Sequence, residues 1–251
     1  MNHMLRFFLT FAWLLLAAVG QSRTIVVSVG ICKYAHIRAL RQAENDARSM
    51  ATLYRSRAAE VTVLLGADAT HERVMQTLRD AFAKARPEDT VVFFFSGHGS
   101  KGGICAYDSK EAASCISYAE VARVVKACAA DNKQLYIDAC YSGGLRLKGK
   151  PGDAVSARTA FSDTEGVMLF LSSRSGETSQ ENPYGPNGQF TKYLVRGLKG
   201  GADDNRNRIV EAHELFRFVS EKVAAATKDR QHPVMWGRFN DAMHLMNWNA
   251  L

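Results

Sequence analysis

The sequence predicts an α/β fold in which a mostly parallel sheet of about six strands carries helices on both faces. Two observations predict it. From residue 24 onward, short apolar segments alternate with segments whose apolar residues recur at helical spacing, and this alternation is typical of parallel sheets covered by helices. The segment 90–96, TVVFFFS, is apolar almost throughout, as expected of a central strand buried on both faces.

Each expected element follows from its local pattern. Short runs rich in Val, Ile, Leu or Phe predict strands at 24–30, 60–65, 90–96, 133–139, 166–173 and, more briefly, near 232–237. Helical spacing predicts helices over 42–57, 70–87, 116–130, 187–201 and 210–227. The second helix has Thr70 as its N-cap and Pro87 beyond its end.

Composition narrows the classes of function. The chain has 251 residues, 47% of them apolar and 23% charged, which fits an ordinary globular protein with a well-filled core. Its formal charge is +7, but the basic residues are scattered without a run of five or six. We therefore expect no nucleic-acid partner.

Residues 1–20 are expected to be a signal peptide. Arg6 precedes an apolar run from Phe7 to Val19, and small residues follow up to a cut ahead of Gln21. The run is short for a membrane span of about 20 residues. We expect a secreted or periplasmic protein with no stable membrane association after cleavage; an uncleaved anchor is the alternative. Export would place the chain's five cysteines in an oxidising compartment, with one thiol left over if four pair.

A His and a Cys are expected to meet at one edge of the sheet. His98 follows the strand 90–96 and Cys140 follows the strand 133–139, and the carboxyl ends of parallel strands form the active-site edge in such folds. A lone His or Cys there would be an ordinary loop or core residue. Together, and with glycines beside both, they predict a thiol nucleophile served by an imidazole and main-chain N–H groups open to an oxyanion.

These motifs resemble those of the caspase-like cysteine peptidases, in particular the metacaspase and bacterial caspase-homologue branch. VVFFFSGHGS and LYIDACYSGG stand 42 residues apart, counted from His98 to Cys140, and VGICKYAHIRALRQAENDARSM is similar to the opening of the family domain. Asp138 is the metacaspase form of a position where animal caspases have Gln. Tyr141 departs from the His that many metacaspases carry. The resemblance implies a three-layer sandwich and a peptidase domain over residues 24–250.

The resemblance also implies the roles of the site residues. His98 would be the acid and base, Cys140 the nucleophile, and the N–H groups of Gly99 and Cys140 the oxyanion hole. No cofactor is required.

A specificity pocket is implied as well, formed by Asp46, Ser96 and Asp138. Two carboxylates in one pocket would hold a guanidinium or ammonium group, so the substrates would be proteins or peptides cut after Arg or Lys. The alternatives are a helix-start role for Asp46, favoured by the helix dipole, and a loop-orienting role for Asp138.

A degraded calcium-loop pattern begins at Asp203. Oxygen-bearing side chains recur at Asn205, Asn207 and Glu214, but Arg208 replaces the Gly that makes the sharp turn. We expect a solvated loop rather than a metal site, and calcium dependence stays open.

The remaining cysteines can be sorted by the predicted layout. Cys105 and Cys115 bracket nine residues, so we expect them to form a disulfide. Cys32 and Cys128 fall at opposite edges of the sheet, beyond the Cα separation of about 4.4–6.8 Å that a disulfide needs, and are expected to be unpaired.

The polar segment after the nucleophile is expected to be an exposed loop. In the family this segment can be cut during activation, and the candidate self-cleavage residues are Arg146, Lys148, Lys150 and Arg158. An ordinary loop without processing is the alternative.

Taken together, these features predict a cysteine endopeptidase that cuts after Arg or Lys. Two other functions remain open from the sequence: a catalytically idle caspase homologue that acts as a binding partner, and a Cys-dependent hydrolase of a non-protein amide or thioester. The sequence sets no oligomeric state.

Overall fold

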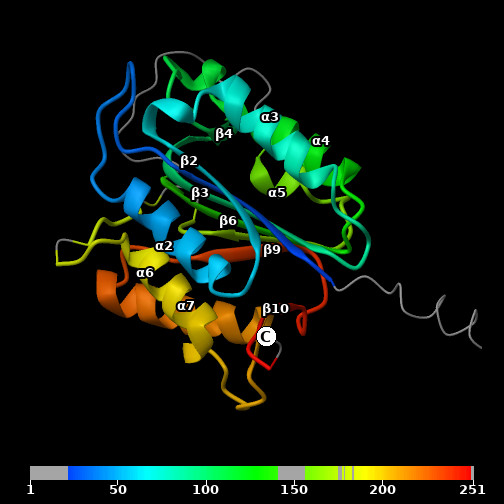
Figure 1. Cartoon of the computed structure of the whole chain (residues 1–251). Helices are drawn as coiled ribbons and strands as arrows, with labels where there is room; N and C mark the ends of the chain where they lie inside the picture. The colour runs from blue at the N-terminus through cyan, green and yellow to red at the C-terminus, as the bar shows by residue number, and fades with distance from the viewer. Residues whose placement is uncertain (1–21, 141–155, 175–176, 178, 183, 250–251) are drawn as a thin grey trace, which may run out of the picture.

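The computed structural model of the chain describes residues 22–140, 156–174, 177, 179–182 and 184–249. The expected three layers are confirmed: a central sheet lies between two groups of helices (Figure 1). The predicted signal peptide and three candidate self-cleavage residues, Arg146, Lys148 and Lys150, lie outside the described residues.

The central sheet runs in the order β2-β1-β3-β6-β7-β9. The first five strands pair in parallel and β9 runs antiparallel to β7. Their bounds are β1 Thr24–Gly30, β2 Glu60–Leu65, β3 Thr90–Ser100, β6 Asn132–Cys140, β7 Val167–Leu171 and β9 Val234–Arg238.

Four further short strands were not expected from the sequence. β4 (Gly103–Ile104) pairs antiparallel with the end of β3 and with β5 (Ile116–Ser117). β8 (Ile209–Glu211) and β10 (His244–Asn247) form a separate two-stranded sheet. Segments of two to four residues are too short for the spacing of apolar residues to show whether they are strands.

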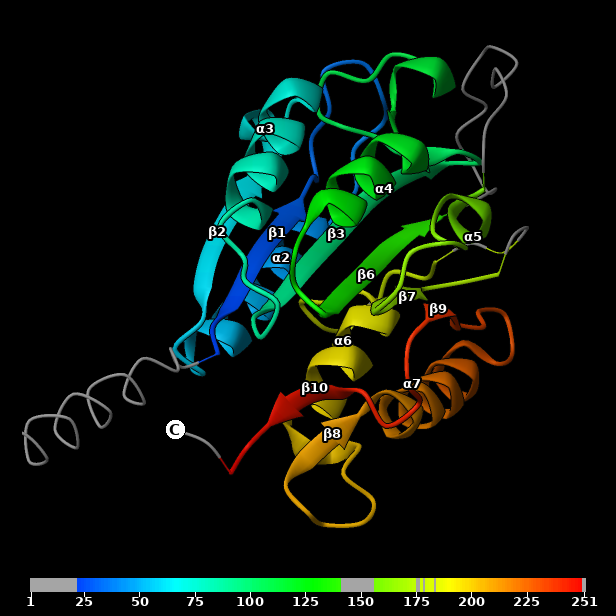
Figure 2. The ribbon, with the colours of Figure 1, turned by 90° about the vertical axis from the view of Figure 1, so that its right-hand side faces the viewer.

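Two groups of helices cover the sheet. One face carries α3 (His71–Phe82), α4 (Tyr118–Ala127) and α5 (Ala157–Ala160), and the other carries α2 (Ala43–Arg55), α6 (Gln189–Arg196) and α7 (Ala212–Thr227) (Figures 1 and 2). None of the helices in these ranges is both long and apolar enough to cross a membrane.

Strand alternation divides the core into two halves. Val27, Phe93 and Phe95 pack with α3, α4 and α5, whereas their neighbours Val26 and Phe94 pack with α2, α6 and α7. Because successive strand residues point to opposite faces, an uninterrupted apolar run supplies both halves. This explains why 90–96 reads as apolar throughout.

Local capping sets helix bounds that differ from those expected. Thr70 caps α3 as predicted, its Oγ1 accepting from the Arg73 N–H, but α3 ends at Phe82, short of residue 87. The helix expected from 116 begins at Tyr118, because Ser117 and Glu120 form a capping box. The helix expected from 210 begins at Ala212, after the last residue of β8.

The strands that carry the site are longer than expected. His98 lies inside β3 and Cys140 is the last residue of β6, so neither lies beyond a strand end. The physical reason is β4: where β3 runs past the end of β1, the β4 strand pairs with it at Gly99 and Ser100. The ladder therefore continues through the glycine-rich segment.

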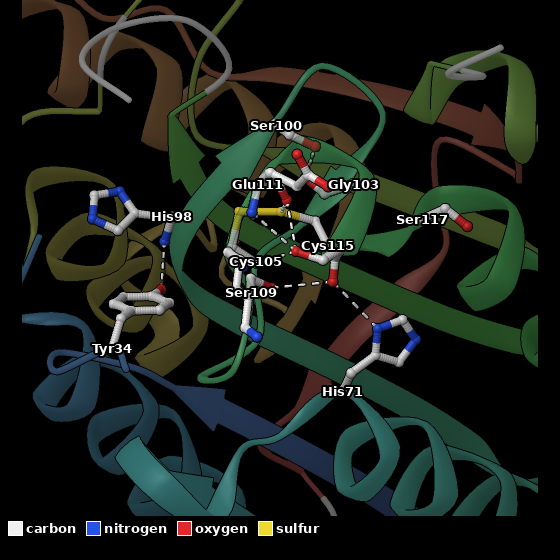
Figure 3. Close-up of a disulfide and its surroundings, with 12 residues drawn as sticks. Tyr34, His71, His98, Ser100, Gly103, Cys105, Ser109, Glu111, Cys115 and Ser117 are labelled. Carbon is white, nitrogen blue, oxygen red and sulfur yellow. Dashed lines mark hydrogen bonds between the residues drawn. A yellow bond between two sulfur atoms is a disulfide. The ribbon is translucent and has the colours of Figure 1, made fainter. Parts of the chain in front are cut away.

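Two of the cysteines lie beside this extension, Cys105 directly after β4 and Cys115 directly before β5. Cys105 and Cys115 are joined by a disulfide (Figure 3). Cys32 and Cys128 carry free thiols.

Candidate active site

The site is built on two adjacent strands at their carboxyl ends. In the parallel pairing of β3 with β6, Ser96 is the register partner of Asp138 and His98 is the register partner of Cys140. Neighbouring strands lie about 4.8 Å apart. The fold thus brings together residues that are 42 positions apart in sequence, as the resemblance implied.

One ring nitrogen of His98 is fixed by the main chain. His98 is 6% exposed, and its Nε2 lies 2.9 Å from the carbonyl oxygen of Arg38, in the segment between β1 and α2. Because a carbonyl can only accept, Nε2 carries the proton and Nδ1 of the neutral ring is left as the acceptor. Burial lowers the pKa of His98, although the Arg38 carbonyl opposes this. The lowered pKa keeps the imidazole neutral near pH 7, with Nδ1 as its acceptor.

The direction of the Gly99 N–H follows from strand geometry. The His98 N–H donates to the hydroxyl of Tyr34, 2.7 Å away, on the side of β3 where β1 has ended. Successive N–H groups along a strand point to opposite sides. The Gly99 N–H therefore points toward β6, the strand that ends at Cys140.

Asp46 is buried and turned toward the sheet. It lies in the first turn of α2 and is 2% exposed, but its carboxylate bonds no N–H of its own helix. Instead it accepts from Ser96 Oγ at 2.9 Å, from Asn187 Nδ2 at 2.9 Å and from the Gly188 N–H at 3.0 Å. A role confined to the helix dipole does not account for these contacts.

Asp138 is buried opposite it. Its carboxylate accepts from the hydroxyls of Ser179 at 2.9 Å and Thr191 at 2.8 Å. A Cβ atom on Gly188 would lie 3.4 Å from Oδ2 of Asp46 and 3.4 Å from Oδ2 of Asp138. The two carboxylates therefore flank one point beside the start of α6.

No cation among the described residues pairs with either carboxylate: no Lys, Arg or His nitrogen lies within 4.0 Å of Asp46 or Asp138. Burial, with the charge of Asp138, raises the pKa of Asp46 to about 7, and burial also raises the pKa of Asp138. Two buried acids without a counter-charge are costly in the ionised form. A positively charged group entering between them would relieve that cost.

Sequence reasoning missed the residues that complete the hydrogen bonding of these two carboxylates. Asn187, Gly188 and Thr191 come from the start of α6, and Ser179 from the segment after β7. The signal available was a run of small and polar residues between β7 and α6, which also fits an ordinary loop.

Two buried glutamines hold that segment in place. Gln42 donates to the Asn182 and Gly185 carbonyls and accepts from the Asn182 N–H. Gln231 donates to the Ser172 carbonyl and accepts from the Gln180 N–H. The segment that supplies the pocket is therefore anchored from α2 and from the chain after α7.

The calcium-like loop bonds to itself. Asp203, Asn205 and Asn207 turn side-chain oxygens to N–H groups of the same loop, and the Glu214 carboxylate accepts from three main-chain N–H groups. The expectation that Arg208 would resist the sharp turn is wrong, because it adopts a left-handed φ of 65°. Across the described residues, no three His, Cys, Asp or Glu side chains are grouped to hold a metal ion.

Arg158 stands apart from the other candidate cleavage residues. It lies in the helical turn α5 with its guanidinium over the ring of Trp236, 5.7 Å from the centroid.

Comparison with known proteins agrees with this fold. The family model described as the caspase domain matches residues 23–243 of the chain. The crystal structure of protein GSU0716 from Geobacter sulfurreducens is similar, with a TM-score of 0.67 and 18% sequence identity over 91% of this chain and 99% of that one. At this identity the similarity shows a shared fold. No match is found among curated proteins.

Proposed function

This chain belongs to the caspase-domain family of cysteine peptidases, and we propose from this that it hydrolyses peptide bonds after Arg or Lys. Cys140 is the nucleophile and His98 the acid and base. The family's thiol chemistry needs no cofactor. The observation that carries the specificity is the pair of buried carboxylates, Asp46 and Asp138, without a cation beside them.

The proposed reaction uses the two strand ends in turn. His98 Nδ1 takes the proton of the Cys140 thiol, and the thiolate attacks the carbonyl carbon of the scissile bond. The N–H groups of Gly99 and Cys140 stabilise the oxyanion. The imidazolium then protonates the leaving amine, and a water molecule activated by His98 hydrolyses the thioester and restores the thiol.

The acidic pocket would set the residue before the cut. A guanidinium or ammonium group between Asp46 and Asp138 gains charge-assisted hydrogen bonds in a site closed to water. Ser96 supports this by holding Asp46 Oδ2. A neutral acyl group gains nothing from two carboxylates, which disfavours an amide or thioester substrate without a cation.

The test is hydrolysis of fluorogenic peptides ending in Arg, Lys or Asp, with calcium or with a chelator. We expect cleavage after Arg and Lys by the wild type and none by Cys140→Ala. Asp46→Asn and Asp138→Asn should lose the Arg and Lys activity, while Asp80→Asn, an exposed carboxylate on α3, should keep it.

Each other outcome points to a different function. Cleavage of no peptide by a folded wild type would favour a binding role, and a preference for Asp would refute the acidic pocket. Calcium should change little, because the loop from Asp203 already bonds its own oxygens.

Self-cleavage after Arg146, Lys148 or Lys150 is part of the proposal. Arg158 is the weakest candidate of the four, because peptidases bind extended chains and Arg158 lies in a helical turn. Intact masses of the wild type and of Cys140→Ala test this, since equal masses would exclude self-cleavage.

We also propose that the protein is exported. The Cys105–Cys115 disulfide supports this, because disulfides persist in oxidising compartments. N-terminal sequencing of the mature protein should find Gln21 as its first residue; a retained Met1 would favour the anchor.

A further inference from the structure

The main-chain N–H of His98 lies where β3 has run past its neighbour. β1 pairs with β3 as far as Gly30 and Ser96, and the Ile31 N–H donates to the Ser96 carbonyl at 3.1 Å. The next N–H on that side belongs to His98, and no β1 residue remains to accept it. The hydroxyl of Tyr34 takes this place at 2.7 Å (Figure 3).

Gly97 makes room for this hydroxyl. A Cβ atom at Gly97 would lie 2.5 Å from the Tyr34 oxygen and 2.8 Å from a ring carbon of Phe95. Real Cβ atoms do not approach so closely, so a larger residue would displace Tyr34. The glycine before His98, which the sequence suggested as leaving main-chain N–H groups open to an oxyanion, therefore has a structural reason as well.

The same segment also contacts the imidazole. The ring of Tyr34 lies 5.0 Å from the ring of His98, at a tilt of 47°, and four residues later the Arg38 carbonyl meets Nε2. The segment is itself anchored: the Ala35 N–H donates to the Tyr107 carbonyl at 3.0 Å, and the Leu40 N–H to the Cys32 carbonyl at 2.8 Å. His98 is thus held at its main chain and at its ring by one fixed segment.

We infer that Tyr34 is a positioning residue for His98 in the peptidase reaction. Its hydroxyl fixes the His98 main chain, and its ring limits the tilt of the imidazole, so that the ring keeps its orientation at the end of the β3–β6 pairing. This inference rests on the proposed function. A misplacement of about 1 Å in a catalytic group can cost about 100-fold in rate, whereas the acidic pocket is built by other residues.

The first test is Tyr34→Phe, which removes the hydroxyl and keeps the ring. We expect kcat on an Arg peptide to fall about 10-fold with KM within about two-fold. The matched control is Tyr193→Phe on α6, whose ring contacts Lys192 and whose parameters should stay at wild-type values. An unchanged kcat in folded Tyr34→Phe would overturn the inference.

A second readout separates positioning from mere stability. The rate of Cys140 alkylation by iodoacetamide is followed against pH by intact mass, with Cys140→Ala as the blank. We expect the inflection in Tyr34→Phe to move upward toward the ordinary thiol value of about 8.5. A purely structural role would lower the melting temperature and leave the inflection in place.

A second variant and the wild-type assay distinguish a folding failure, a failure of the proposed function and a failure of the inference about Tyr34. If Tyr34→Phe does not fold, Gly97→Ala displaces the hydroxyl while keeping Tyr34 and should give the same upward shift; a wild-type inflection would count against the inference. If the wild type and Tyr193→Phe both fail to cleave any peptide, the proposed function fails, and the alkylation profile still decides the role of Tyr34.

Discussion

At the scale of single residues, Gly188 lies at the centre of the proposed site. It donates its N–H to Asp46, and the place of its missing side chain lies between the carboxylates of Asp46 and Asp138. Its φ of −56° is open to any residue, so backbone conformation does not require a glycine here.

Gly188→Ala should therefore fold normally and bind basic substrates poorly. The added methyl group meets the carboxylate oxygens at ordinary contact distance but occupies the point where we propose that the substrate cation binds. We expect kcat/KM for Arg peptides to fall about 10- to 100-fold, measured by steady-state hydrolysis. Asp80→Asn, the exposed substitution on α3, is the comparison, and equal activity of Gly188→Ala and wild type would contradict the proposed pocket.

The pH dependence of KM should report on Asp46. Its pKa is raised to about 7, so the carboxyl is protonated below that pH and loses its proton as the pH rises through it. The pocket gains negative charge in the same window, and KM for an Arg peptide should decrease from pH 6 to pH 8. Asp80→Asn should keep this dependence, and a wild-type KM that does not change between pH 6 and pH 8 would contradict it.

At the scale of elements, the segment between β7 and α6 supplies Ser179, Asn187 and Gly188 to the two buried carboxylates, and its described residues form no helix or strand. Gln42 and Gln231 compensate for this by bonding its main-chain groups from two sides. Both side chains are buried, where an unpaired polar group costs about 1–3 kcal/mol. The two glutamines therefore hold the segment between β7 and α6 in place.

Gln231→Leu should loosen the segment between β7 and α6. It leaves the Ser172 carbonyl and the Gln180 N–H without their partner, and we expect a loss of about 1–3 kcal/mol in the free energy of unfolding and a higher KM for Arg peptides. Urea titration and steady-state kinetics measure the two effects. Gln76→Leu on α3 is the control. An unchanged KM in Gln231→Leu would show that the segment keeps its position without the Gln231 side chain.

At the scale of the whole molecule, two core halves share one sheet, and the site lies at the edge where both end. The disulfide belongs to this scale. It joins the residue after β4 to the residue before β5, and the Cys105 N–H donates to the His98 carbonyl at 2.9 Å. The disulfide restricts the unfolded chain, and it also fixes Cys105, whose N–H bonds the strand that carries His98.

Removal of the disulfide should lower global stability. For a loop of this length the loss of chain-entropy stabilisation is about 3 kcal/mol, so Cys105→Ala with Cys115→Ala should unfold at lower urea concentration. Cys128→Ala, which removes a free buried thiol, should cost about 1 kcal/mol. Equal midpoints for the double variant and the wild type under oxidising conditions would show that the bridge does not stabilise the fold.

The sequence by itself determined the layered fold and placed His98 beside Cys140, and its resemblance to the caspase-like peptidases implied Asp46 and Asp138 as the acids of the proposed pocket. The fold and the His98–Cys140 pair rest on strand and helix periods and on residue types that carry chemistry, which are visible in a linear chain. Only the tertiary structure showed that the Arg38 carbonyl accepts from Nε2 of His98, that the Tyr34 hydroxyl accepts from the His98 N–H, and that Gly188 lies between Asp46 and Asp138. Every residue has the same main-chain carbonyl, and the conformation of a loop depends on what it packs against. Neither can therefore be predicted from a local sequence pattern.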